Sequence, residues 1–530
     1  MLQLAEREYD AIVIGAGASG GIAALLLADA GLDVLVLDAG WSASFWRAPT
    51  RKMASAAFQL SAQALRADVL PLPARWAGRA LSRVLGRIRQ PVQSTCFAWV
   101  DGPEQYVDDR DAPYETPPDA PFHWIRAWQV GGRMSVPSHG RLYSRMAPEE
   151  FGLHGRNGGW PIGYNDLAPW YDIVEGLLGL SQAGAPQVPP AAQGRELQDR
   201  LRHRWPALVT SVGRTAPPLP ALASASLTGR VTFRDGAVAH QVLTDATGAT
   251  SGAAWFDRSD ARIRTARARL VFLAASALES ARILMMSRAA QHPDGLGGQS
   301  GALGRYLMDH LLVSGTGTAD ADAMQSVGPE PHAWMIIRRM DRRDPTRHDE
   351  IAPYSMQLYQ SAQSQRRAPF AAVSFAPMAP RWENRISLHP DRHDAFRRPL
   401  LRITCRPSGD ELATASRQAR AIVELAEVCN ARVHRFDGCP PVPGAAVHEA
   451  GVARMGLSPD GSVLNPFNEC WDAPGLFVTD AAAYPSLPSH APTLTGMALT
   501  ARAVQHALRA RGHAGLRSSL VARTAATLAG

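Results

Sequence analysis

The sequence predicts an α/β protein with more than one domain, and three observations lead to this fold class. The chain has 530 residues, of which 46% are hydrophobic. This length is greater than one domain with a single hydrophobic core usually has. Its N-terminal segment places a helix rich in small residues between two buried apolar runs, the pattern of a parallel sheet. The region 311–440 instead mixes alternating strand-like runs with one strong helical pattern, which indicates a second sheet with helices.

The first element is a compact β-α-β unit. Tyr9–Ile14 has the apolar run of a buried parallel strand, Gly21–Ala30 the pattern of a helix, and Asp33–Asp38 that of a second strand. Parallel strands buried on both faces show such nearly continuous apolar runs. The unit is therefore of the Rossmann type.

The turn between the first strand and the helix has the spacing G-x-G-x-x-G, from Gly15 to Gly20. Gly15 permits a tight turn, Gly17 lets the backbone approach a pyrophosphate, and Gly20 lets helix and strand pack closely. Asp38 follows Gly17 after 38 − 17 = 21 residues, where an acid can bind ribose hydroxyls. These features predict a dinucleotide site, and the motif alone leaves FAD and NAD both open.

The later elements follow from the same patterns. Pro186–Pro220 is proline-rich and is expected to be a connector. The remaining predicted elements are a β-meander at Val231–Asp260, strands at Ala268–Ala275 and Gly475–Asp480, and helices at Leu278–Met286, Leu412–Val428 and Thr493–Arg509.

The composition excludes several classes of protein. The net charge is +7 and the pI about 9.4, but Lys52 is the only lysine, so codon bias explains the arginine excess better than a nucleic-acid surface does. No G-x-x-x-x-G-K-S/T phosphate loop occurs. The five cysteines are odd in number, widely spaced and without a C-x-x-C pair, which argues against a disulfide framework, a zinc site and an iron–sulfur cluster. We expect no metal site and no nucleic-acid partner.

We expect a cytoplasmic protein. The chain does not open with a basic segment followed by an apolar one, and it contains no run of about 18 apolar residues. Arg75, Arg79, Arg83 and Arg87 recur every four residues beside an apolar face, which predicts an amphipathic basic helix. That helix is either a solvated surface element or a contact for an acidic protein partner or a membrane surface.

Several blocks in the C-terminal third resemble one known family. His448–Gly456 (HEAGVARMG) resembles the H-x-x-G-T-x-R-M-G signature of the glucose–methanol–choline (GMC) oxidoreductases, and Ala491–Thr495 resembles their N-P-T-L-T segment. Further similar blocks, in the same order as in the family, are Val130–Arg133, Gly159–Ile162, Asp166–Tyr171, Gly304–His310 and Leu476–Ala481. The resemblance is to the bacterial sugar and polyol branch, which includes relatives of gluconate dehydrogenase and pyranose oxidase.

The resemblance implies a Rossmann-type FAD-binding domain and a second, sheet-plus-helices substrate-binding domain. The FAD-binding domain would consist of residues 1–45, 126–180, 221–310 and 441–530, the substrate-binding domain of 311–440, and lid or connector segments of 46–125 and 181–220. We expect FAD to be held without a covalent bond, because Pro137 stands at the aligned position of the flavin-linking histidine and His139 is two residues away. The candidate cofactor-binding residues are Gly15, Gly17, Ala18, Ser19, Gly20, Asp38, Gly131, Gly132, Ser135, Val238, Asp480, Ala481, Thr493 and Leu494.

The resemblance also implies alcohol oxidation, in which a base takes the hydroxyl proton while the carbon-bound hydride passes to flavin N5. A histidine can serve as this base near neutral pH. His448 occupies the place of the family's base, and His490, 490 − 448 = 42 residues later, can fill the place of the second polar residue near the flavin. We expect both to be catalytic, with His490 hydrogen-bonded to the same substrate oxygen so that it positions the carbon. The substrate would be a small alcohol, and O2, a quinone or a cytochrome would be the electron acceptor.

Departures from the family pattern leave alternatives open. Ala491 stands where the family has Asn, Val452 where Thr is common, and Ser276 where a glycine ends the A-A-G turn. The chain could instead be a member with non-redox or unusual flavin chemistry, such as a hydroxynitrile lyase or a desaturating enzyme. A third alternative is a non-enzymatic or NAD-binding α/β protein.

Overall fold

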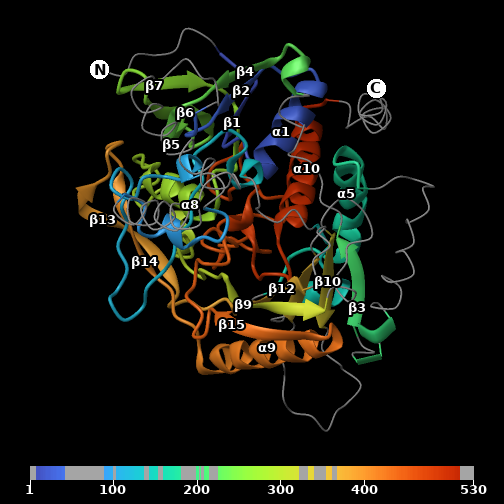
Figure 1. The fold of residues 1–530 in the computed structure, drawn as a ribbon. Coiled ribbons are helices and arrows are strands. Elements are labelled where there is room, and N and C mark those ends of the chain that lie inside the picture. The colour runs from blue at the N-terminus through green and yellow to red at the C-terminus, as the bar shows by residue number, and fades with distance from the viewer. Residues whose placement is uncertain are drawn as a thin grey trace, which may run out of the picture.

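The computed structural model describes most of the chain (Figure 1). The described residues are 8–41, 89–99, 103–136, 143–152, 159–180, 199–201, 203–204, 208–213, 225–320, 332–338, 354–360 and 367–513. The predicted Arg75–Arg87 helix lies outside them, as do Pro137 and His139, on which the prediction of non-covalent FAD depends. Within the described ranges, no helix is long and apolar enough to span a bilayer.

A parallel five-stranded sheet, with strand order β16-β8-β1-β2-β4, forms the centre of the Rossmann-type part. Its strands are β1 (Ala11–Ile14), β2 (Val34–Leu37), β4 (Val231–Arg234), β8 (Leu270–Leu273) and β16 (Leu476–Val478). Four of the five are buried along their whole length, and β4 is the partly exposed edge strand. The predicted first and second strands, and the strands near 268–275 and 475–480, are thereby confirmed with shorter ends.

Helices on this sheet bring the two ends of the chain together. The first helix, α1 (Ala18–Asp29), packs against the C-terminal helix α10 (Thr493–Ala510), and α10 packs against α5 (Tyr164–Leu177) (Figure 1). Helix α8 (Ala277–Met286) follows β8 directly. Segments at opposite ends of the sequence therefore form one core.

The predicted β-meander at 231–260 is only partly correct. Its first strand, β4, pairs in parallel with β2, with Val34 opposite Val231, and so extends the Rossmann sheet. The antiparallel three-stranded sheet is made of β5 (Ala237–Thr244), β6 (Thr250–Asp257) and β7 (Arg262–Arg267). The free edge of β2 accepts β4, a pairing that the local alternation of the sequence does not reveal.

The second layer is a six-stranded antiparallel sheet of order β15-β9-β12-β11-β10-β3. Its strands are β3 (Leu208–Gly213), β9 (His310–Asp320), β10 (His332–Arg338), β11 (Tyr354–Gln360), β12 (Arg367–Pro377) and β15 (Ala431–Asp437). Helix α9 (Gly409–Val428) packs against β9, β12 and β15 (Figure 1). Its N-terminus is capped by Ser408, whose Oγ accepts the Glu411 N–H at 3.3 Å.

The connector predicted at 186–220 was wrong in one respect, because it contains β3, the edge strand that pairs with β10. The strand was not predicted because the prolines on both sides of it are typical of a connector. A separate hairpin joins β13 (Arg385–His393) to β14 (Pro399–Thr404). Short 3₁₀ helices lie at Gln93–Thr95, Pro103–Gln105, Gly132–Ser135, Pro148–Gly152, Gly298–Ser300 and Ala481–Ala483.

Candidate active site

In the glycine turn between β1 and α1, the fold requires Gly15 and Gly20 to lack a side chain, whereas Gly17 faces open space. A Cβ added to Gly15, whose φ is +95°, would lie 2.3 Å from the Ala274 carbonyl oxygen, and one added to Gly20 would lie 1.7 Å from the Gly15 carbonyl oxygen. A Cβ at Gly17 would meet no described atom within 4 Å. Gly17 is the N-cap residue of helix α1, which has no side-chain cap and no acid in its first turn. Its first N–H groups therefore face open space and suit a pyrophosphate.

An open cleft extends from this turn to the segment that follows residue 440. It contains about 1560 Å³ of space that protein atoms do not fill, its open mouth included. The predicted site residues that line it are Gly15, Gly17, Ala18, Ser19, Asp38, Gly131, Gly132, His448, Asp480, Ala481 and Thr493. The structure thus brings the glycine turn and His448, more than 400 residues apart in sequence, to one cleft.

The other predicted site residues do not line the cleft. Gly20 packs helix against strand, and Leu494 is buried in the core. Val238 packs with Phe256 and Phe396, while its neighbours on β5, Ala237 and Ala239, line the cleft in its place.

Two buried carboxylates lie on the cleft wall. Asp38 accepts the Ala16 N–H at 2.8 Å and the Gly40 N–H at 2.7 Å, and Asp480 accepts the Ser280 hydroxyl at 2.5 Å and the Ala482 N–H at 2.9 Å. Burial raises the pKa of each to about 6. Each carboxylate oxygen has a further lone pair, so both acids suit the hydroxyl groups of a ribose or ribityl chain.

The Gly131–Gly132 turn closes the cleft from another side. Both glycines have positive φ, +88° and +58°, and a Cβ at Gly132 would lie 3.8 Å from Gly17 Cα. Ser135 packs under Gly131, since a Cβ there would lie 2.0 Å from the Ser135 Oγ. The turn therefore lies against the glycine loop, which accounts for the V-G-G block in the sequence.

Arg133, directly after this turn, connects three segments of the cleft lining through its contacts with Glu449 and Ser276. Its Nη1 donates to Glu449 Oε2 at 2.9 Å and its Nη2 donates to Ser276 Oγ at 3.2 Å. Ser276 has a φ of +78°, which explains why glycine is usual at this position of the family. The sequence identified Ser276 as a departure but gave no sign that its hydroxyl meets Arg133.

His448 follows Val447, a β-branched residue with a φ of +58°. Such a conformation is strained and persists where the surrounding structure enforces it, often at functional sites. The backbone N–H of His448 donates to Asp309 Oδ1 at 3.1 Å. Burial, and next the nearby Glu449, raise the pKa of Asp309 to about 7. Asp309 therefore holds the backbone that presents His448.

The imidazole of His448 packs against two rings from the six-stranded sheet. Its centroid lies 4.9 Å from that of His310 and 5.1 Å from that of Phe375. Ser374 Oγ accepts from Gln418 of α9 at 3.0 Å, so its neighbour Phe375 faces the other side of the sheet. Helix α9 therefore covers one face of the sheet, and His448 packs against the other face.

His490 lies apart from the cleft lining. Its Nδ1 is 3.1 Å from the Ala491 carbonyl oxygen and its Nε2 is 3.1 Å from the Arg145 carbonyl oxygen. Ser489 is anchored through its N–H to Glu150 Oε1 at 2.7 Å. Both ring nitrogens of His490 therefore face backbone acceptors in this structure.

His310 is a site residue that sequence reasoning missed. Its Nε2 is 2.7 Å from the Pro488 carbonyl oxygen, and burial lowers its pKa to about 4. The ring is therefore neutral near pH 7, and it joins His448 to the segment that carries His490. The only signal in the sequence was its place at the end of the Gly304–His310 block.

Comparison with known proteins agrees with this geometry. The sequence profile of a family described as GMC oxidoreductase matches residues 380–500, and one described as NAD(P)-binding Rossmann-like domain matches residues 13–84. The chain thus carries the C-terminal GMC oxidoreductase domain together with a Rossmann-like domain, and its relatives are sugar and polyol oxidases and dehydrogenases of the GMC family. The resemblance found in the sequence is thereby confirmed, as is the Rossmann-type fold class.

Similar GMC proteins act on alcohols and sugars. The 2-methyl-1,2-propanediol dehydrogenase of Mycolicibacterium austroafricanum is 25% identical over 74% of this chain and 88% of its own length. The C-glycoside 3-oxidase of Microbacterium trichothecenolyticum is 30% identical over 53% and 52%. The paromamine 6'-oxidase of Streptomyces fradiae is 24% identical over 95% and 91%.

The fold is that of a solved GMC structure. A formate oxidase variant from Aspergillus oryzae superposes with a TM-score of 0.61 at 14% identity, covering 96% of this chain and 100% of that one. This superposition shows the fold, and the family profile and the alcohol- and sugar-oxidising relatives show an FAD-dependent oxidoreductase that acts on CH–OH donors. The residues present fit FAD, because the uncapped start of α1, the open space at Gly17 and two buried acids line one cleft.

Proposed function

We propose that this enzyme oxidises a CH–OH group of a small polyhydroxylated substrate, such as a diol or a sugar, with His448 as the base that accepts the hydroxyl proton. One observation carries the proposal: His448 lies on the wall of the same cleft as the glycine turn. Relatives that act on a propanediol, a C-glycoside and paromamine support this substrate class. FAD, when bound, supplies the acceptor for the carbon-bound hydrogen and its electron pair.

The surroundings of His448 suit proton transfer from a hydroxyl. Asp309 accepts the backbone N–H of His448 at 3.1 Å and so fixes the main chain beside the ring. The rings of His310 and Phe375 pack against the imidazole, and a positioned base can raise the rate by about 10²–10⁴-fold. His490, whose ring nitrogens face two carbonyls, would have to turn to reach a substrate oxygen. Its part in substrate binding stays a prediction.

The proposed function is tested by mixing the purified enzyme with diols, sugars and glycosides in the absence of O2. We expect one class to bleach the flavin absorbance and to yield the matching carbonyl product. A substrate that is turned over without any bleaching would contradict the redox mechanism and favour lyase chemistry. Reoxidation by O2, a quinone or cytochrome c, followed in the same cell, then identifies the electron acceptor.

We also propose that FAD is bound without a covalent link. The support is the sequence, because proline stands at position 137, where the flavin-linking histidine is expected. Acid precipitation of the holoenzyme should release all of the yellow colour into the supernatant. A yellow protein pellet would contradict this proposal.

A further inference from the structure

A second cavity lies apart from the active-site cleft. It is formed where the end of α8 and the loop after it meet the first residues of β13 (Figure 1). It contains about 850 Å³ of space that protein atoms do not fill, its open mouth included, and three of its lining residues are the arginines Arg288, Arg305 and Arg385. None of its lining residues also lines the active-site cleft, so the two cavities are separate.

The backbone places two of these arginines side by side. Arg305 and Arg385 form an antiparallel bridge, next to which the Ile386 N–H donates to the Gly304 carbonyl at 2.8 Å. Residues directly opposite each other in such a bridge project to the same side, with Cβ atoms about 4.5–5.5 Å apart. Like charges in this position repel each other and destabilise the pairing. The fold therefore holds two positive charges together on the wall of the cavity.

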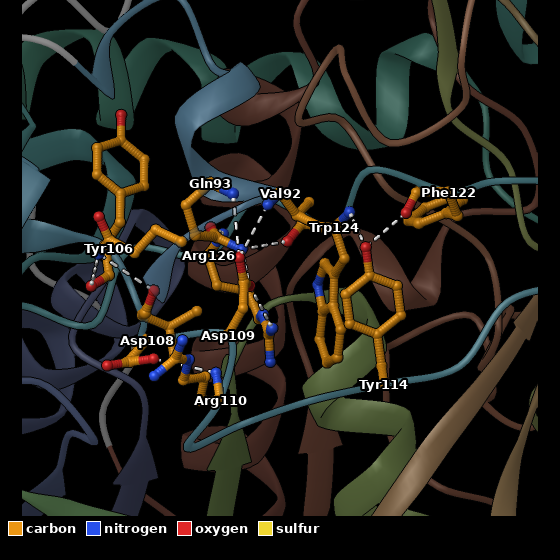
Figure 2. Close-up of polar contacts among 12 residues, drawn as sticks. Val92, Gln93, Tyr106, Asp108, Asp109, Arg110, Tyr114, Phe122, Trp124 and Arg126 are labelled. Atoms are coloured by element: carbon orange, nitrogen blue, oxygen red, sulfur yellow. Dashed lines mark hydrogen bonds and ion pairs between the residues drawn. The ribbon is translucent and has the colours of Figure 1, made fainter. Parts of the chain in front are cut away.

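No neighbouring acid neutralises these charges. In the part of the chain that the structure describes, none of the three arginines forms an ion pair with a carboxylate. Asp294 is the one acid among the described residues of the lining, so three arginines against one acid leave a net charge of +2. Arginines elsewhere have acidic partners: Figure 2 shows Arg126 beside Asp109, at 3.4 Å, and Arg264 pairs with Asp257 at 2.9 Å.

The three guanidinium groups are accessible to a ligand. Arg288 and Arg385 are exposed, and no nitrogen of the half-buried Arg305 is enclosed by protein. Arg288 donates through Nε to a backbone carbonyl at 3.3 Å, and Arg385 donates through Nη1 to another at 3.4 Å. Arg305 stacks on Trp382, with its Cζ 4.6 Å from the ring centroid. Stacking orients the guanidinium and leaves its N–H groups available, so each arginine retains donors for a ligand.

The rest of the lining is apolar. Met285 and Ile386 are buried, and Leu303 and Leu388 are half-buried. Guanidinium groups bind carboxylate and phosphate oxygens through paired, charge-assisted hydrogen bonds, and concave sites with apolar walls and a few polar groups hold small organic molecules. The combination suits an organic anion with two or more negative charges.

We infer that this cavity binds a small organic anion with phosphate or several carboxylate groups, and that Arg305, Arg385 and Arg288 are its ligands. An anion between Arg305 and Arg385 removes the repulsion across their bridge. The same segment also supports the active site, because the Arg305 carbonyl accepts the N–H of Val452, four residues after His448, at 3.0 Å. The inference does not depend on His448 as the base or on the identity of the substrate.

The experiment titrates the holoenzyme with pyrophosphate and with citrate at constant ionic strength, measured by titration calorimetry. FAD occupies the glycine turn in the holoenzyme, which keeps the probes from binding there. We expect saturable binding of at least one probe, and the tighter one indicates whether the natural ligand carries phosphate or carboxylate groups. Arg385→Gln should weaken this binding roughly 10- to 100-fold, the loss of a charge-assisted bond.

The matched control is Arg264→Gln, which removes the same charge from β7, outside the lining of the cavity. It should leave the affinity within about twofold of wild type. Arg288→Gln, at the third arginine, should weaken binding as Arg385→Gln does, and it provides a second variant should one of them fail to fold.

Thermal melting distinguishes a ligand site from a purely structural cluster. Because Arg385→Gln removes a repulsion, the ligand-free variant should melt at the wild-type temperature or above it. The probe should raise the melting temperature of the wild type more than that of the variant. The inference would be overturned if neither probe bound saturably, if both arginine variants bound with wild-type affinity, or if Arg385→Gln melted lower without any loss of affinity.

Discussion

The variant Gly17→Ala tests whether Gly17 is needed for binding of the cofactor and not for folding. A methyl group at Gly17 meets no described atom within 4 Å, and the φ of −74° suits alanine. Gly→Ala gains about 0.4–1 kcal/mol from the unfolded chain, while alanine is a poorer N-cap than glycine by a similar amount. The apoprotein should therefore unfold within about 3 °C of wild type.

The same methyl group occupies the space through which the pyrophosphate would approach α1. Losing two charge-assisted N–H contacts costs about 3–6 kcal/mol, which lowers FAD affinity by at least about a hundredfold. Fluorescence titration of the apoprotein with FAD measures this affinity, and circular dichroism measures the melting temperature.

Two companion variants calibrate the result. Gly409→Ala, at the start of α9, also enters open space and should alter neither property. Gly20→Ala places its Cβ 1.7 Å from the Gly15 carbonyl oxygen and should destabilise the fold by about 1–3 kcal/mol or more. Wild-type FAD affinity in Gly17→Ala would refute the assignment of the glycine loop to the pyrophosphate.

Three further predictions concern Asp309, Ser276 and His490. The pKa of Asp309 is raised to about 7 from its ordinary 3.8, so the folded state binds its proton first and wild-type stability falls as pH rises from about 4 to 7. In Asp309→Asn this decline should be smaller, by at most about 1.4 kcal/mol per pH unit, and parallel melting curves across that range would contradict it. Ser276→Gly should relieve the +78° φ and raise stability by about 1 kcal/mol net, and a loss of stability in denaturant titration would contradict this. His490→Ala should slow anaerobic flavin reduction less than His448→Ala does, and an equal or larger effect would give His490 a direct catalytic part.

The residues that could be predicted from the sequence belong to local motifs. Gly15, Gly17 and Asp38 lie within one β-α-β unit, whose spacing depends only on the geometry of a strand, a turn and a helix. His448 was found through its resemblance to a family signature. Elements with regular apolar periodicity, such as α9 and α10, were also found, with ends that differ by a few residues.

What the sequence could not predict depends on contacts between distant segments. The pairing of β4 with β2 and of β3 with β10 is decided by which sheet edge is free, and short alternating runs do not encode that choice. The ion pair between Arg133 and Glu449 joins residues 316 apart.

The most direct test of the proposed mechanism is the rate of flavin reduction in His448→Ala, measured by anaerobic stopped flow with a good substrate. The control is His434→Ala, a histidine on β15 whose Nε2 lies 2.9 Å from Thr318 Oγ1, away from the cleft lining. We predict that both variants retain FAD, that His434→Ala matches wild type, and that His448→Ala is reduced at least about a hundredfold more slowly. Reduction of His448→Ala at the wild-type rate would contradict the proposal that His448 accepts the substrate proton.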